Sequence, residues 1–407
     1  MRIEAIAIGT ELLTTSRVDT NSVWIAQRLA DLGLGFHRKT AVGDSREDLR
    51  GLFLEALDRS DLIICTGGLG PTFDDFTKEL WAEVLGAPLV EDLAIRATIE
   101  AFFTSRNRPC PPSNFKQALV PVGAEALLNP VGTAPGIYWE RPKGFPNTRL
   151  VLLPGVPREM KRMWEDRVEP RLRALAGRPT HTLRMLVGSV GESALEQRTN
   201  PLRENHANLD WTILASLGQV ELVARSADQV ALDAAQRDFE AELGVDRVCT
   251  GPGSLESTVI DQLKTRGQSL ALAESMTGGR IASLLTGVPG ASEAFLGGAV
   301  VYSPRAKAEL TGLSGDCIRE QGTVSEAVTG ALAEGIRARL GADWGLAVTG
   351  NAGPTEDKDG PAPVGTFFMA VAGPEGTVAQ AMNFPGDRQD IQIRAATFAL
   401  DFLRRRL

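Results

Sequence analysis

Apolar positions along the first 168 residues fall into two alternating patterns. Short apolar runs predict buried strands, and apolar positions three and four apart predict helices with one buried face. Strands are expected at residues 3–8, 61–65 and 150–153, and helices at 21–32, 49–56, 77–85 and 158–168. Alternating strands and helices are typical of a parallel sheet with helices on both faces. Residues 1–170 are therefore predicted to form an α/β domain.

The pattern changes twice further along the chain. A polar stretch with Gly177 and Pro179 marks one boundary, and the sequence GPGS at 251–254 marks another. Residues 171–250 are expected to form a small α+β domain, and strand–helix alternation returns over 251–407. The predicted fold class is two α/β domains with largely parallel sheets, joined by the small domain.

Composition narrows the classes of function. The chain has 407 residues, of which 43% are hydrophobic and 23% charged, as in globular proteins with sizeable cores. Its formal net charge of −8 argues against a nucleic-acid or anionic-membrane surface. No apolar run reaches the ~18 residues of a membrane span, and no secretory signal opens the chain, so we expect a cytoplasmic protein. The scattered cysteines and histidines predict neither a disulfide framework nor a zinc site.

Residues 273–279 read AESMTGG, an apolar strand that delivers a serine to a Thr-Gly-Gly turn before a helix. Backbone N–H groups at a helix N-terminus attract phosphates and developing oxyanions. We therefore expect Thr277, Gly278 and Gly279 to bind such a group and Ser275 to be a candidate nucleophile.

A serine nucleophile needs a base, and no histidine lies in this part of the chain. In the next predicted strand and helix, the strand ends at Tyr302, Ser303 and Pro304 suit a helix start, and Lys307 follows one turn later. Neighbouring parallel strands end at one edge of a sheet, so Ser275, Tyr302 and Lys307 are expected to converge. Lysine acts as a base only if its pKa falls from ~10.4 toward ~7. The alternative interpretation is a surface lysine and a capping serine.

The first domain carries a second candidate site. Its strand at 61–65 runs into TGGLGPTFDD, where Gly67, Gly68 and Gly70 allow backbone N–H groups to approach a phosphate beside Thr72. Asp74 and Asp75 are candidate ligands for a divalent metal ion. The alternative is a pair of helix-capping carboxylates. The same sheet edge is expected to hold Glu11, Asp19, Asn21, Gly132, Thr133, Gly155 and Glu159.

The C-terminal motifs resemble one family. AESMTGG, GGAVVYSPRAK, QGTVS, AVTGNAGP, PVGT and GDR match, in order, the CinA C-terminal or PncC family over residues 255–407. That family hydrolyses the carboxamide of nicotinamide mononucleotide to nicotinate mononucleotide and ammonia, and is similar to Ser/Lys amidohydrolases. The resemblance implies that Ser275 is the nucleophile, that Lys307 is the general base and that Tyr302 supports or orients the pair. It implies no cofactor for this reaction.

The same resemblance suggests the groups that bind the substrate. Gly350, Ala352 and Gly353 are expected at an oxyanion- or phosphate-binding loop, and Arg388 or Arg394 at the 5′-phosphate; the alternative is two surface arginines flanking the last helix. The chain departs from the family pattern at Met276, Pro304 and Asn351, which replace cysteine, asparagine and isoleucine. A Gly/Pro-rich loop at 353–363 is expected to form a wall of this site.

The remaining motifs resemble the other parts of full-length CinA. GTELL, VDTNS, TGGLGPTFDDFT, NPVGTAPG and LPGVPREM are similar to the CinA N-terminal domain, which is related to molybdopterin-binding folds. This resemblance implies an ADP-ribose pyrophosphatase that needs a divalent metal of the Mg, Mn or Co class. The middle domain resembles a KH-type unit; its GSVG sequence at 188–191 is followed by Glu192, which favours a structural turn over RNA binding. The family also implies a homodimer.

These patterns predict a bifunctional hydrolase of pyridine nucleotides, with nicotinamide mononucleotide and ADP-ribose as small-molecule partners. Two alternatives remain open: a non-catalytic scaffold that senses nucleotides in competence or damage response, and a molybdopterin-binding N-terminal module.

Overall fold

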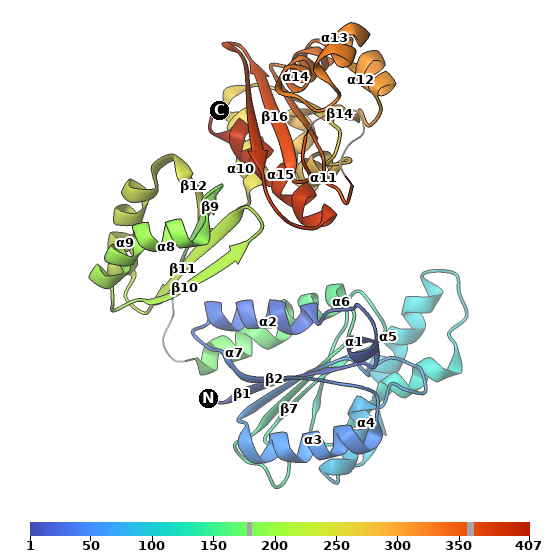
Figure 1. Ribbon diagram of the computed structural model, residues 1–407. Coiled ribbons are helices and arrows are strands. Elements are labelled where there is room, and N and C mark those ends of the chain that lie inside the picture. Colours follow the sequence, from blue (N-terminus) through green and yellow to red (C-terminus); the bar gives the residue numbers. More distant parts are fainter. Residues whose placement is uncertain (177–180, 356–361) are drawn as a thin grey trace. The chain divides into compact units, whose positions relative to one another are not determined.

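The computed structural model describes residues 1–176, 181–355 and 362–407. The chain divides into two compact units, Met1–Thr180 and His181–Leu407, and Figure 1 shows helices packed against sheets in both. The predicted α/β class is confirmed. Helix α7 (Glu169–Leu175) crosses the expected boundary at residue 170, and the segments 171–250 and 251–407 largely share one unit.

The first unit is built on a six-stranded sheet in the order β2-β1-β3-β8-β7-β6. The pairs β1–β2, β1–β3 and β3–β8 are parallel, and β7 and β6 extend the sheet in antiparallel fashion. The elements are β1 (Ile3–Ile8), α1 (Glu11–Thr14), α2 (Thr20–Asp31), β2 (Phe36–Val42), α3 (Arg46–Arg59), β3 (Leu62–Thr66), α4 (Thr77–Val84), β4 (Leu89–Glu91), α5 (Leu93–Thr104), η1 (Pro112–Ala118), β5 (Leu119–Pro121), β6 (Glu125–Leu127), β7 (Gly136–Glu140), β8 (Arg149–Leu153), α6 (Pro157–Met163), η2 (Trp164–Val168) and α7.

Helices cover both faces of this sheet, as Figure 1 shows for α2 and α7 on one side and α3 and α4 on the other. On the first side, Leu29 and Trp164 are fully buried against the strands. On the second side, the rings of Phe53 and Trp81 stack with their centroids 4.0 Å apart. Burial on two faces explains why β1 and β3 are apolar or buried at every position.

The second unit begins with a four-stranded antiparallel sheet in the order β10-β11-β9-β12. Its core includes Leu222 and Phe239, and Trp211 stacks on Phe239 with ring centroids 4.6 Å apart. The expected strands and helices of the small α+β segment are present. They are β9 (His181–Gly188), α8 (Glu192–Asn205), β10 (Asp210–Ser216), β11 (Gln219–Ser226), α9 (Gln229–Leu243), η3 (Gly244–Asp246) and β12 (Arg247–Thr250).

A five-stranded sheet follows, in the order β14-β13-β15-β16-β17. Strand β13 pairs in parallel with β14 and β15, whereas β15–β16 and β16–β17 are antiparallel. The elements are α10 (Leu255–Arg266), β13 (Leu270–Glu274), α11 (Arg280–Thr286), η4 (Ala291–Glu293), β14 (Phe295–Val300), α12 (Pro304–Thr311), α13 (Gly315–Gln321), α14 (Glu326–Leu340), β15 (Trp344–Gly350), β16 (Thr366–Gly373), β17 (Gly376–Asn383) and α15 (Arg388–Arg404). This sheet is thus only partly parallel.

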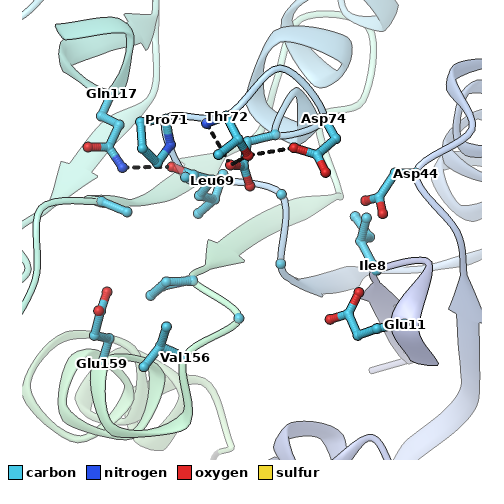
Figure 2. Close-up of a pocket in the computed structure, with 18 of the residues that line it drawn as sticks. Ile8, Glu11, Asp44, Leu69, Pro71, Thr72, Asp74, Gln117, Val156 and Glu159 are labelled. Carbon is cyan, nitrogen blue, oxygen red and sulfur yellow. Dashed lines mark hydrogen bonds between the residues drawn. The ribbon is translucent and has the colours of Figure 1, made fainter. Parts of the chain in front are cut away.

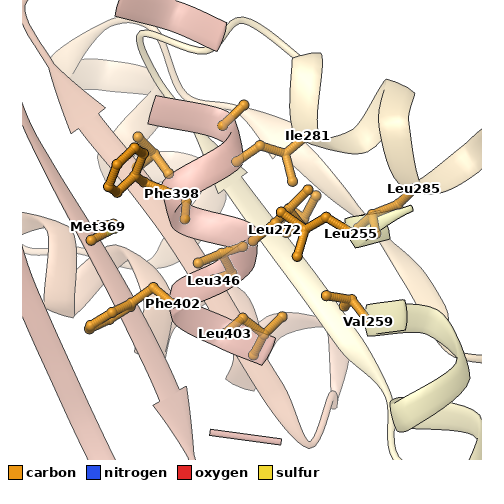
Figure 3. Packing of buried hydrophobic residues seen from close by; sticks show 14 of the residues in the cluster. Leu255, Val259, Leu272, Ile281, Leu285, Leu346, Met369, Phe398, Phe402 and Leu403 are labelled. Atoms are coloured by element: carbon orange, nitrogen blue, oxygen red, sulfur yellow. The ribbon is translucent and has the colours of Figure 1, made fainter. Parts of the chain in front are cut away.

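The core of this sheet is closed by its last helix. Figure 3 shows Phe398, Phe402 and Leu403 of α15 in one cluster with side chains of β13, β15, α10 and α11. The end of α15 also meets the antiparallel sheet: Arg404 donates to the carbonyl of Arg247 (3.2 Å), and Arg405 donates to that of Gly188 (3.1 Å). Helix α15 therefore holds the two sheets of the second unit together.

Candidate active sites

Strand β13 positions the candidate serine. All five residues of the strand are buried between its two parallel neighbours. The backbone N–H of Ser275 continues the ladder with a 2.9 Å bond to the carbonyl of Val348. Ser275 therefore stands at the carboxyl edge of the sheet, and its side chain is largely buried.

Helix α12 positions the candidate base. Ser303 caps the helix by accepting a hydrogen bond from the N–H of Ala306, and Pro304 is the first helical residue, as predicted. Lys307 follows one turn later and is only 2% exposed. Its Nζ lies 2.9 Å from the Oγ of Ser275 and 2.9 Å from the carbonyl oxygen of Val301. The structure thus brings together the serine and the lysine that the strand order predicted to converge.

Glu274, a residue that the sequence analysis did not consider, occupies the N-terminus of α11. Its buried carboxylate accepts hydrogen bonds from the N–H groups of Gly279 (3.1 Å), Ile281 (3.0 Å) and Ala282 (2.8 Å). The N–H of Gly278 donates to the carbonyl of Ser275. The prediction that Gly278 and Gly279 offer free N–H groups is therefore wrong, because an internal anion and the turn itself already use them.

A cavity of about 700 Å³ opens beside the serine–lysine pair. Of the predicted residues, Gly350, Ala352, Gly353 and Arg388 line it with the pair, while Thr277 does not. Thr323 and Val324, which also line it, belong to the QGTVS motif and were not predicted individually. The complete lining is Ser275, Met276, Tyr302, Pro304, Lys307, Thr323, Val324, Gly350, Asn351, Ala352, Gly353, Thr355 and Arg388.

Tyr302 and Arg388 form one side of this cavity. The guanidinium of Arg388 donates 2.9 Å to the hydroxyl of Tyr302 and also to the carbonyl of Gly353. Tyr302 is 62% exposed. Its hydroxyl thus faces Arg388, and the expected role of Tyr302 toward the serine–lysine pair stays a prediction.

The loop after β15 lies against the residue that follows the serine. A side chain at Gly350 would collide with the sulfur of Met276, so only glycine fits there. Asn351 stiffens the loop, since it accepts from the N–H of Gly353 (2.9 Å) and donates to the carbonyl of Ala362 (3.2 Å). Of the predicted wall at 353–363, residues 356–361 lie outside the described residues.

Arg394 does not line this cavity. Its guanidinium lies over the ring of Phe384, 5.2 Å from the centroid, and lines a different cavity of the second unit. The two arginines are six residues apart on or at the start of one helix, so they project in different directions. Of the two arginines considered for the 5′-phosphate, only Arg388 lines the Ser275 cavity.

The first unit has its own cavity, of about 510 Å³, at the carboxyl edge of its parallel strands. Figure 2 shows Glu11 and Asp44 on one side of it and Glu159 on the other. Most of the predicted residues line it: Glu11, Gly67, Gly68, Gly70, Thr72, Asp74, Asp75, Thr133, Gly155 and Glu159. Asp44, Arg17 and Gln117 also line it and were not predicted.

Three predicted residues lie outside this lining. Asp19 caps α2 by accepting from the N–H of Ser22 (2.9 Å). Asn21 is buried and donates 2.8 Å to the carbonyl of Gly155, so it supports the lining from behind. Gly132 packs against the carboxylate of Glu159, where a side chain would collide. Each of these three residues is thus engaged in a contact within the fold.

The Gly-rich turn holds its two carboxylates through Thr72. The hydroxyl oxygen of Thr72 lies within hydrogen-bond reach of the carboxylates of Asp74 (2.5 Å) and Asp75, and the N–H of Thr72 donates to Asp75 (2.9 Å). The bond from Thr72 lowers the pKa of Asp74. Burial raises the pKa of Glu159, against a bond from Asn129 that lowers it. Asp74 is therefore the better placed of these carboxylates to carry a negative charge.

Helix η1, which the sequence analysis missed, fastens this turn. Gln117 donates 3.2 Å to the carbonyl of Leu69, and Lys116 donates 2.7 Å to that of Thr72. The buried Lys78 donates in turn to the carbonyls of Lys116 (2.9 Å) and Gln117 (3.4 Å), and burial lowers its pKa to about 8. The turn is thus fixed by three cationic or amide side chains.

Two family descriptions match the chain and together define its class. The "CinA C-terminal domain" matches residues 253–407, and the "Probable molybdopterin binding domain" matches residues 4–174. A CinA-like protein of Acidobacterium capsulatum is 40% identical over 417 residues, covering 100% of both chains. A CinA-like protein of Synechococcus sp. RCC307 is 43% identical and covers 95% of this chain and 93% of its own. The chain belongs to the family of CinA-like proteins.

Solved structures match in part. The protein CinA of unknown function from Thermoplasma acidophilum is 33% identical and covers 42% of this chain and 96% of its own, with a TM-score of 0.38. A CinA superfamily protein from Escherichia coli is 31% identical and covers 38% of this chain and 88% of its own, with a TM-score of 0.37. No helix within the described residues has the length and apolarity needed to cross a membrane.

Proposed function

We propose that the second unit is a serine amidohydrolase that converts nicotinamide mononucleotide to nicotinate mononucleotide and ammonia. The observation that carries this proposal is the 2.9 Å contact between the Nζ of Lys307 and the Oγ of Ser275 beside a cavity of about 700 Å³. A lysine paired with a serine hydroxyl in a buried site is the arrangement expected of an activated nucleophile. A cavity of this volume is within the range of small-molecule sites.

In this mechanism an uncharged Lys307 accepts the proton of Ser275. Burial disfavours an ammonium charge, so the low exposure of Lys307 favours the basic form. The carbonyl of Val301 accepts from the same amine and fixes its direction. The serine oxygen attacks the carboxamide carbon, ammonia leaves with the proton returned by Lys307, and water then hydrolyses the acyl-enzyme.

The oxyanion needs donors other than the N–H groups of Gly278 and Gly279, which are already used within the fold. The backbone N–H groups of Met276 and Ala352 belong to cavity-lining residues and have no acceptor among the residues that the structure describes. We assign these two groups to the developing oxyanion. Arg388, which lines the cavity beside Tyr302, is the candidate for the 5′-phosphate.

Ammonia release from nicotinamide mononucleotide tests this proposal. Ser275→Ala and Lys307→Met are expected to lower kcat by on the order of 10⁶-fold, as loss of a nucleophile or its base does in a serine hydrolase. Lys307→Arg should be equally inactive, because a guanidinium stays protonated. Ser283→Ala and Lys264→Met, exchanges of the same kind away from the cavity, are the controls. Normal turnover by Ser275→Ala would refute the serine mechanism.

For the first unit we propose a metal-dependent pyrophosphatase that splits ADP-ribose into AMP and ribose 5-phosphate. Five carboxylates, those of Glu11, Asp44, Asp74, Asp75 and Glu159, line its cavity together with a Gly-rich turn. No three acidic, histidine or cysteine side chains converge within the described residues to form a ready-made metal site. Mg²⁺ is commonly bound by one or two carboxylates and by substrate phosphates, so Asp74 and Asp75 fit such an ion. When bound, the ion would neutralise phosphate charge.

AMP formation from ADP-ribose with Mg²⁺, Mn²⁺ or Co²⁺ tests this second proposal. Asp74→Asn should abolish it, while Asp19→Ser, which keeps the cap of α2, should not. If ADP-ribose binds but no variant or metal changes its slow background hydrolysis, the unit is a nucleotide-sensing module. If it binds a pterin phosphate in preference, the molybdopterin-binding alternative is correct.

A further inference from the structure

The second unit has a further cavity, of about 550 Å³, where its antiparallel sheet meets α15. One wall is the GSVG turn between β9 and α8 and the hairpin turn between β10 and β11. The other wall comes from the end of β17 and from α15, with Met382, Phe384, Arg394 and Phe398. The hairpin turn touches the helix directly, since a side chain at Gly218 would meet Thr397 and Phe398. None of these residues lines the Ser275 cavity.

Arg394 brings a positive charge to this cavity, whose lining also includes the exposed carboxylate of Glu192. Its guanidinium is held over the ring of Phe384, and its buried Nε has no hydrogen-bond partner. Within residues 1–176, 181–355 and 362–407, Arg394 forms no hydrogen bond or ion pair, and the exposed Glu192 of the same lining does not pair with it. The rest of the half-buried guanidinium is therefore available to an acidic group in the cavity.

The GSVG turn supplies polar groups on the opposite wall. The N–H groups of Val190 and Gly191 have no acceptor among the described residues. Ser189 adopts the left-handed region with φ of 56°, which is uncommon for a residue other than glycine. Successive N–H groups in such a turn form a small anion-binding concavity. The same wall includes the polar residues Glu192 and Ser216 and the apolar residue Leu217.

We propose that this cavity binds a small organic anion, a carboxylate or phosphate monoester on a planar apolar body. The acidic group would meet Arg394 and the N–H groups of the GSVG turn, and the apolar body would lie against Met382 and Phe398. A few convergent polar groups beside apolar side chains, in a cavity of this volume, are characteristic of small-molecule sites. The ligand would touch both the antiparallel sheet and α15 and would strengthen their contact. This site does not depend on the proposed deamidase reaction.

Titration calorimetry on the full chain tests the site, with benzoate as the carboxylate probe and phenyl phosphate as the phosphate probe. The titration uses the Arg388→Gln variant, so that binding of the probe in the Ser275 cavity contributes little to the measured heat. At least one probe is expected to bind, and the preferred probe identifies the head group. Adding Arg394→Gln should weaken binding by about tenfold or more, the loss expected for a charge-assisted hydrogen bond. Unchanged affinity, or no binding of either probe at millimolar concentration, would overturn the proposal.

A second measurement covers the case in which Arg394→Gln does not fold. In wild-type protein labelled at methionine methyl carbons, the NMR signal of Met382 should shift on addition of the probe, because Met382 lines this cavity. The signal of Met276, which lines the Ser275 cavity, is the internal control. A shift of Met276 without a shift of Met382 would contradict the proposal and leave the deamidase proposal intact.

Discussion

The side-chain amide of Gln392 donates a 2.7 Å hydrogen bond to the backbone carbonyl of Met276. Gln392 lies in α15, so the last helix of the chain fixes the residue that directly follows the candidate nucleophile. A net hydrogen bond of this kind is worth about 1 kcal/mol. The contact therefore helps to orient the backbone N–H of Met276, which is one of the two groups assigned to bind the oxyanion.

Gln392→Leu is expected to lower kcat for deamidation by about fivefold to tenfold with little change in KM, because the misdirected donor acts in the transition state. Steady-state kinetics of ammonia release measure this effect. Gln389→Leu, at an exposed position of the same helix, is the control. A change in KM alone would mean that Gln392 serves substrate binding instead.

Glu274→Gln is expected to destabilise the second unit. A neutral amide accepts fewer of the three N–H bonds that the carboxylate accepts, and it also loses the favourable interaction with the N-terminus of α11. Hydrogen bonds to charged groups are worth about 1.5–3 kcal/mol, so the free energy of unfolding should fall by about 2 kcal/mol. Urea unfolding measures this. Glu326→Gln, in the exposed first turn of α14, should have little effect.

Arg388→Gln is expected to raise KM for nicotinamide mononucleotide by about tenfold or more, through loss of a charge-assisted bond to phosphate. The matched variant Arg394→Gln should leave KM unchanged, because Arg394 lines the other cavity. Nicotinamide riboside, which has no phosphate, checks the assignment. Its KM should be the same for Arg388→Gln and for the wild type. Equal effects of both arginine variants would contradict it.

Lys78 is expected to make the stability of the first unit depend on pH. Its pKa is about 8 in the fold and 10.5 ordinarily, so between these values the unfolded chain binds more protons than the folded one. The contribution of Lys78 to the free energy of unfolding therefore rises by up to about 3 kcal/mol between about pH 8 and pH 10.5. Below pH 8 this contribution is constant. Urea unfolding from pH 7 to pH 10.5 should show this rise in wild type and not in Lys78→Met.

The fold was predictable where one pattern dominated. Strands such as β1, β3 and β13 are short apolar runs, and their burial on both faces leaves no other interpretation. Strand β17 was missed because its residues alternate between exposed and half-buried positions and include glycine, alanine and polar residues. Helix α8 continues through Pro201 to Asn205, although a proline inside a helix normally favours its end. Tertiary packing there outweighs the local preference of proline.

The candidate sites were predictable where sequence order fixes a sheet edge. Ser275 and Lys307 follow neighbouring parallel strands, and the pair meets as expected. The sequence could not show which of Arg388 and Arg394 lines the Ser275 cavity, because both are arginines near the start of one helix. Their side chains point in different directions and line different cavities. Glu274 was overlooked because an acidic residue before a Gly-rich turn gives no sign, in sequence alone, that it folds back onto the helix that follows.

Helix α15 has 17 residues, and along it stand Arg388 at one cavity, Gln392 behind the serine, Arg394 at the other cavity and Arg404 against the antiparallel sheet. An uninterrupted helix of this length slides or tilts as a single rod. A ligand that draws the antiparallel sheet toward one end of α15 would therefore also move Arg388 and Gln392 near the other end. Communication between the two cavities needs no chain of intermediate side chains, because the backbone of one element already spans them.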